Sequence, residues 1–103
     1  IAAMRPGVPV CDLFFLCKAA FEEHCLSFGM PHIGHSIGLN VHEFPMISPQ
    51  TTEPLQPGML ICIEPLYRSE EGIYHTEDLV LVTDGEPKVL SRSANWGELL
   101  VLQ

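Results

Sequence analysis

Two strand-like segments on either side of a polar turn limit most strongly how this chain can fold. Residues 59–66 begin with a short apolar run that has the length and residue types of a buried strand. Residues 73–83 form a second strand-like segment, and residues 68–72 between the two are polar and end in glycine. We therefore predict an antiparallel pair of strands that turns at residues 68–72.

A hairpin with this turn places two acidic residues opposite each other. The midpoint between Glu64 and Glu77 falls at position 70.5, inside the turn, so a symmetric register pairs the two carboxylates directly. Two like charges in that arrangement repel and destabilise a sheet unless a cation lies between them or one of them holds a proton. The pair therefore indicates a metal site.

The rest of the chain predicts one long helix and further short strands. From Pro9 to about Ser27 apolar residues recur at three- and four-residue steps, with Pro9 suited to the first turn and Gly29 to the position past the end. Asp84-Gly85 suits a hairpin turn before a short strand at 88–90, and residues 96–103 suit a last strand. The predicted fold class is α+β, with the long helix packed on a curved, mostly antiparallel sheet.

A stretch rich in histidine and glycine precedes the two strands. His35 and His42 are seven residues apart, a spacing that puts side chains on opposite faces of a regular strand. The two imidazoles can share one pocket only if the chain turns near Gly38 and Asn40. Taken alone, His35 is more often a structural histidine than a ligand. Beside the two opposed carboxylates it suits a divalent ion such as Mn, Fe, Co or Zn.

An ion held in this way activates water, and the surrounding residue types suit hydrolysis. A nearby carboxylate can take a proton from the water and pass it to a leaving group. A second histidine can hydrogen-bond the substrate carbonyl or the oxyanion that develops from it. The stretch and the two acids together therefore predict a hydrolytic metal site.

Composition disfavours several other classes of function. Five Lys and Arg against thirteen Asp and Glu give a formal charge of -8, which repels nucleic acid and anionic membranes. No apolar run is long enough to cross a bilayer and no signal region is recognisable, so we expect a soluble, cytoplasmic protein. The four cysteines lack Cys-x-x-Cys spacing, and we expect them to be reduced, with Cys17 on the buried face of the helix. We expect His24, late in that helix, to be structural.

Four short motifs occur in a fixed order along the chain: residues 34–43 around the two histidines, residues 55–59, residues 63–65 and residues 76–83. Together they resemble the C-terminal part of the methionine aminopeptidase, prolidase and creatinase superfamily, the "pita-bread" fold. Each motif alone is weak, but four in this order with matching gaps are specific, and the resemblance runs from about Pro6 to Leu90. The pattern is most similar to Xaa-Pro dipeptidases and aminopeptidases.

The resemblance implies a role for each matching residue. His35 matches the single histidine ligand of a dinuclear metal site, Glu64 matches the ligand that shuttles protons, and Glu77 matches the carboxylate that bridges the ions. His42 matches the histidine that contacts the substrate. His75 stands where many proline-specific members carry arginine, so we place it at the substrate too and leave the preference for Xaa-Pro bonds open. The implied cofactors are two divalent ions (Mn, Co, Fe or Zn), and the implied substrate is a short peptide.

The superfamily also has two aspartate ligands, which lie upstream of the segment that matches residues 9–27. Asp12 lies in the predicted helix and cannot replace them. We therefore expect residues 1–103 to be a single domain, the C-terminal portion of a catalytic domain without its N-terminal half, and inactive alone. The expected partner is the missing half or a second copy. Two alternatives stay open, a non-catalytic peptide- or protein-binding relative and a creatinase-like hydrolase or lyase of a non-peptide substrate.

Overall fold

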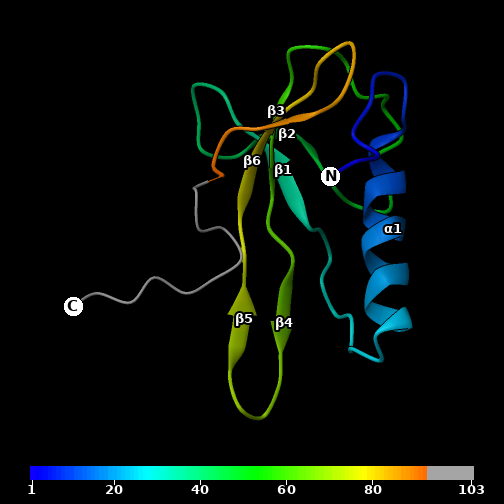
Figure 1. Cartoon of the computed structure of the whole chain (residues 1–103), viewed down its shortest axis with the longest axis vertical. Helices are drawn as coiled ribbons and strands as arrows, with labels where there is room; N and C mark the ends of the chain where they lie inside the picture. Colours follow the sequence, from blue (N-terminus) through cyan, green and yellow to red (C-terminus); the bar gives the residue numbers. More distant parts are fainter. Residues whose placement is uncertain (93–103) are drawn as a thin grey trace, which may run out of the picture.

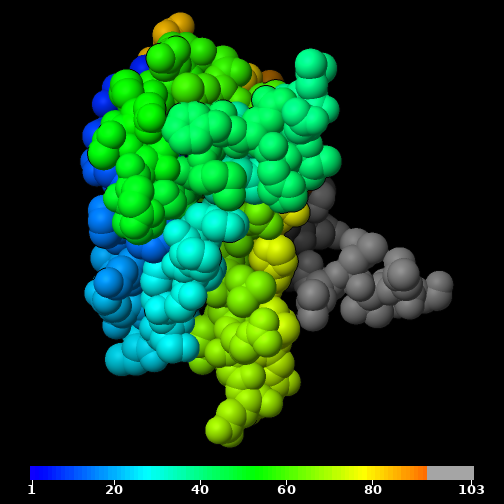
Figure 2. Space-filling view, turned by 180° about the vertical axis from the view of Figure 1, so that it is seen from behind, coloured from blue at the N-terminus to red at the C-terminus, as the bar shows by residue number. Residues whose placement is uncertain are grey.

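The computed structural model describes residues 1–92, which form one helix and two antiparallel sheets (Figure 1). The helix runs along one side of the larger sheet, and the smaller sheet projects from the molecule as a hairpin, which is also visible from behind (Figure 2). The α+β prediction is confirmed. The elements are α1 (Val10–Glu23), β1 (Gly34–Ser36), β2 (Glu43–Met46), β3 (Leu60–Ile63), β4 (Leu66–Arg68), β5 (Ile73–His75), β6 (Asp78–Leu81) and β7 (Lys88–Val89).

The larger sheet has the strand order β2-β1-β3-β6-β7, and β4 pairs with β5 in the smaller sheet. Ile63 of β3 faces Asp78 of β6, and Leu66 of β4 faces His75 of β5. The midpoint of each pair falls at position 70.5, which is also the midpoint of the predicted pair of glutamates. The predicted register is therefore confirmed.

The predicted pair of continuous strands is wrong in one respect, because each strand is interrupted. Glu64-Pro65 separates β3 from β4, and Thr76-Glu77 separates β5 from β6. Proline has no N–H to donate to a neighbouring strand, which is a local reason for the ladder to stop here. Glu64 and Glu77 therefore lie in register with each other but between two ladders rather than within one.

The core lies between α1 and the larger sheet. Val10, Leu13 and Phe14 come from the helix, while Ile61 and Val80 are Cα partners on β3 and β6 with no exposed surface. Burying a side chain of this size contributes about 1.5–3 kcal/mol. These contacts fix the helix against one face of the sheet.

Cys17 packs at the margin of this core and is half-buried, so its predicted burial is confirmed in part. Burial raises the pKa of its thiol, and the positive end of the chain lowers it by a smaller amount. All four cysteines are free in the structure, as predicted from their spacing.

The helix begins where predicted, directly after Pro9, but it ends earlier than the predicted Ser27. Cys25 has a φ of 55° and its N–H donates to the Glu22 carbonyl, while the N–H of Leu26 donates to the Phe21 carbonyl. These two bonds form a Schellman motif, with cysteine in the left-handed position that glycine usually takes. His24 has the expected structural role, because its Nδ1 lies 2.8 Å from the Ala20 carbonyl oxygen.

The hairpin predicted at Asp84-Gly85 is confirmed, since β6 pairs with β7 across it. The Thr83 hydroxyl donates to the Glu86 carbonyl and accepts from the Gly85 N–H, which closes the turn. The strand predicted at residues 96–103 lies outside the described residues. Within residues 1–92, none of the helical structure combines the length and apolarity that a membrane span requires.

Candidate metal centre

His35 is the middle residue of β1, which pairs with β2 on one side and β3 on the other. His35 is 2% exposed, and its Nδ1 lies 3.0 Å from the Ser36 carbonyl oxygen. Because a carbonyl only accepts, Nδ1 carries the proton and donates. Gly34 allows this close pairing, since a Cβ there would lie 2.0 Å from the Cys62 carbonyl oxygen.

His42 reaches His35 because the chain folds back between β1 and β2. The Asn40 N–H donates to Glu43 Oε1 at 2.9 Å, and a Cβ on Gly38 would lie 2.4 Å from the other oxygen of that carboxylate. The imidazole ring centroids of His35 and His42 are consequently 4.3 Å apart. The predicted turn near Gly38 and Asn40 is confirmed, and it brings both histidines to one place.

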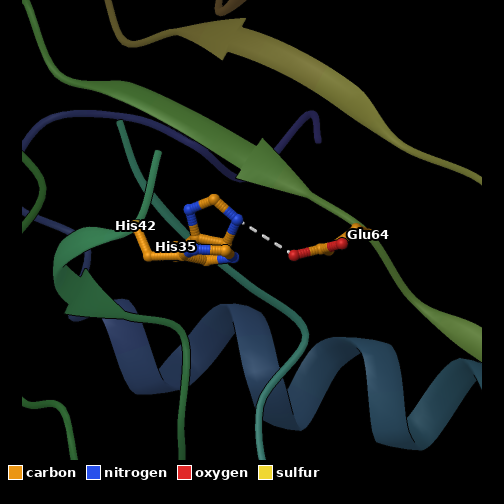
Figure 3. Close-up of side chains that lie close together, drawn as sticks. All are labelled: His35, His42 and Glu64. Atoms are coloured by element: carbon orange, nitrogen blue, oxygen red, sulfur yellow. Dashed lines mark ion pairs between the residues drawn. The ribbon is translucent and has the colours of Figure 1, made fainter. Parts of the chain in front are cut away.

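Glu64 follows β3 and completes the cluster (Figure 3). Its backbone N–H donates to the Ile33 carbonyl at 2.8 Å, which fixes the start of the interruption beside β1. Its Oε1 lies 3.0 Å from His35 Nε2, and its side chain is 21% exposed. One ligand atom from each of His35, His42 and Glu64 lies within 4.8 Å of the others.

The hydrogen-bond roles in this cluster suit a cation. With the proton on Nδ1, the Nε2 of a neutral His35 presents a lone pair to a carboxylate oxygen at 3.0 Å. Two electron-rich atoms at that distance require a proton or a metal ion between them or beside them. A histidine that donates its other N–H to a backbone carbonyl is the usual arrangement of a metal ligand. Two imidazoles and a carboxylate suit a divalent transition metal.

Glu77 lies opposite Glu64 in the register but points to a different neighbour. Its exposed carboxylate lies beside the buried thiol of Cys62, the residue of β3 that pairs with His35. Burial raises the pKa of that thiol, and a hydrogen bond to Glu77 and the charges of Glu77 and Glu64 raise it further. Both acids are thus near the thiol, while the group within residues 1–92 that could hold a metal ion contains His42 rather than Glu77.

His75 contacts the other oxygen of Glu64, with Nε2 3.3 Å from Oε2. Together they border a cleft of about 590 Å³ that opens next to the cluster. Sequence reasoning gave no role to several residues of its wall, although Arg68 and Leu66 stand on the strand that faces His75. The cleft is lined by Ser27, Gly29, Met30, Pro31, His32, Glu64, Leu66, Arg68 and His75.

Known proteins resemble this chain along most of its length. The family model described as metallopeptidase family M24 matches residues 1–84. The Xaa-Pro dipeptidase of Pyrococcus furiosus is 33% identical over 95 residues, which are 90% of this chain and 27% of that protein. The putative dipeptidase YkvY of Bacillus subtilis is 39% identical over 85 residues, 81% of this chain and 23% of that protein. The chain therefore spans about a quarter of the length of these curated relatives.

The same relationship is found in three dimensions. A solved Xaa-Pro dipeptidase from Bacillus anthracis matches this chain with a TM-score of 0.85 and 28% identity, over 99% of this chain and 29% of the other. The likeness includes the helix and the five-stranded sheet that hold the cluster, the arrangement of the pita-bread fold. With its sequence and its fold both matched in this way, the chain belongs to metallopeptidase family M24.

Proposed function

We propose that this chain provides the C-terminal part of the catalytic domain of a peptidase that uses two metal ions to hydrolyse short peptides, including Xaa-Pro dipeptides. Enzymes of family M24 depend on dinuclear metal sites. The observation that carries the proposal is the buried imidazole of His35, which faces the Glu64 carboxylate at 3.0 Å beside an open cleft. A fold used only for binding has no chemical need for that pair.

The proposal assigns the ligand roles to His35, Glu64 and Glu77. His35 and Glu64 already point at each other, and Glu77 lies opposite Glu64 in the register of the two interrupted strands. When bound, the ions (Mn, Co, Fe or Zn) would polarise the carbonyl of the scissile bond and acidify the attacking water. Glu77 would have to swing from the Cys62 thiol towards Glu64 to take part.

The catalytic steps assigned to this chain are proton transfer and orientation of the substrate. Glu64 accepts a proton from the attacking water and delivers it to the leaving amine. His42, exposed at the mouth of the cluster, hydrogen-bonds the substrate carbonyl and the oxyanion that develops on it. His75, on the wall of the cleft, contacts the part of the peptide beyond the scissile bond.

The proposal also includes a partner segment. Asp12 is exposed on α1, and within the described part of the chain the metal-ligand cluster includes no aspartate. The further ligands that two ions need would come from a preceding segment of a longer protein or from a second copy of the chain. The proposed location is the cytoplasm, where the four free cysteines would stay reduced.

The test uses the full-length gene product, stripped of metal with a chelator and reloaded with Mn or Co. We expect hydrolysis of Xaa-Pro or other dipeptides that depends on the added metal. The change Glu64→Gln should reduce kcat by about 100-fold to 10,000-fold, because the amide cannot shuttle the proton. Glu23→Gln makes the same chemical change on an exposed part of α1 and should leave kcat unchanged.

Four results would contradict the proposal. Metal-independent turnover, or full activity of the Glu64→Gln protein, would remove the assigned mechanism. Peptide binding without cleavage at saturating metal would favour the non-catalytic alternative. Cleavage of creatine-like amidines, but of none of the dipeptides, would favour the creatinase-like alternative.

A further inference from the structure

The Glu64 carboxylate lies between two imidazoles. Oε1 lies 3.0 Å from His35 Nε2, and Oε2 lies 3.3 Å from His75 Nε2. The two histidines come from different sheets, since His35 is in β1 and His75 is in β5. The projecting hairpin therefore contributes a direct contact to the metal-ligand cluster in the larger sheet.

The register of the β4–β5 hairpin brings His75 within reach of Glu64. His75 faces Leu66 across the hairpin, and Glu64 lies two residues before Leu66 on the same chain. Diagonal neighbours on one face of an antiparallel pair are within reach of long side chains. Leu66 is held in turn, because its N–H points to Met30 Sδ at 3.0 Å across the cleft.

The contact is too exposed to contribute much to stability. The side chain of His75 is 43% exposed, and ion pairs of that exposure contribute about 0–1 kcal/mol. Its effect on geometry is more specific. A carboxylate without a donor can rotate about its last carbon–carbon bond, whereas a donor at Oε2 fixes that rotation and keeps Oε1 directed at the His35 side.

We infer that His75 is a positioning residue for Glu64: its Nε2–H donates to Oε2 and sets the orientation in which Oε1 serves the metal-ligand cluster. This inference rests on the proposed function of Glu64. It assigns to His75 a task besides the substrate contact predicted from the sequence. Partners of metal-ligating carboxylates and histidines commonly change metal affinity or activity about tenfold to a hundredfold.

The test compares three variants of the full-length protein loaded with Co²⁺. His75→Ala removes the donor, and His75→Gln keeps an N–H donor at a similar reach. His24→Ala makes the alanine change at an exposed histidine beyond the end of α1, away from the cleft. Three quantities are measured: Co²⁺ affinity by competition with a chelator, the visible d–d absorption spectrum of the bound Co²⁺, and kcat and KM for a dipeptide.

For His75→Ala we expect Co²⁺ affinity and kcat to fall about tenfold to a hundredfold, with an altered spectrum, and KM to rise as well because the proposed substrate contact is lost. His75→Gln should recover most of the spectrum and of kcat, and His24→Ala should match the unchanged protein. An unaltered spectrum and affinity in His75→Ala would overturn the inference, as would an effect on KM alone. The spectrum and affinity need no substrate, so a protein that fails to hydrolyse peptides but shows these changes supports the positioning role and refutes only the proposed function.

Discussion

Among the glycines of residues 1–92, Gly34 is the one at which an added methyl group would be most crowded. A Cβ at this position would lie 2.0 Å from the Cys62 carbonyl oxygen, a backbone atom of the neighbouring strand that cannot move aside without shifting β3. The residue next to it is His35, so any separation of β1 from β3 also displaces the buried imidazole. The glycine thus couples strand pairing to the geometry of the site.

We expect Gly34→Ala to lower the free energy of unfolding by about 2 kcal/mol, because the added methyl overpacks the β1–β3 pair. Denaturant unfolding of the full-length protein measures this. Gly85→Ala is the matched control, since a Cβ there meets nothing within 4 Å, and its effect should stay within about 0.5 kcal/mol. If Gly34→Ala lowered the free energy of unfolding no more than Gly85→Ala, β1 and β3 would be able to move apart without a loss of stability.

The sequence predicted some residues of the candidate metal centre better than others. His35 and Glu64 were identifiable from charge opposition and motif spacing, and the structure places them 3.0 Å apart. That His42 approaches His35 as a possible ligand depends on the Asn40–Glu43 bond, which no periodicity reveals. The roles of all five residues towards metal and substrate stay predictions, those of His35, Glu64 and His42 as well as those of Glu77 and His75.

At the scale of elements, the strand register was predictable and the element ends were not. One polar turn centred between two like charges fixes the pairing of β3 with β6 and of β4 with β5. The break between β3 and β4 could be predicted from Pro65, because proline has no N–H to donate to a neighbouring strand. The end of α1 has no such signal, because cysteine rather than glycine occupies the left-handed position.

The left-handed conformation of Cys25 after α1 can be tested by mutation. Replacing Cys25 with glycine removes the steric conflict of a Cβ at φ 55°. We expect Cys25→Gly to raise the free energy of unfolding by about 0.5–1 kcal/mol, after allowing for the greater freedom of glycine in the unfolded chain. Cys25→Ala keeps the Cβ and should change stability little. The measurement is thermal unfolding. A less stable Cys25→Gly protein would show that contacts of the cysteine side chain stabilise the fold by more than the left-handed backbone conformation costs.

At the scale of the whole molecule, several elements within residues 1–92 expose large apolar side chains. Phe15 and Leu16 are more than half exposed on α1, as are Phe44 on β2 and Ile73 on β5. Exposed apolar side chains of this size are available for contact with another chain segment. It agrees with the proposal that another segment or another copy completes the catalytic domain.

We predict that the 103-residue chain alone binds metal weakly and hydrolyses dipeptides at no appreciable rate. A two-metal mechanism needs both ions held a few ångströms apart, and three ligands are too few for that. The measurement adds Mn or Co to this chain, with and without a separately expressed upstream half, and follows cleavage of Xaa-Pro and other dipeptides. Robust metal-dependent turnover by the chain alone would show that a second copy, or acids to which we assign no such role, completes the site.

The interruption at Glu64-Pro65 and Thr76-Glu77 also means that the two sheets need not open together. A two-stranded ribbon is marginally stable by itself, so the β4–β5 hairpin can fray while the five-stranded sheet stays closed. Such an opening withdraws His75 from Glu64 and widens the cleft, whereas β1 and β3 keep His35 and the backbone of Glu64 in place. The expected consequence is a protein that admits and releases its ligand through local unfolding of this hairpin, while the buried imidazole of His35 stays in place.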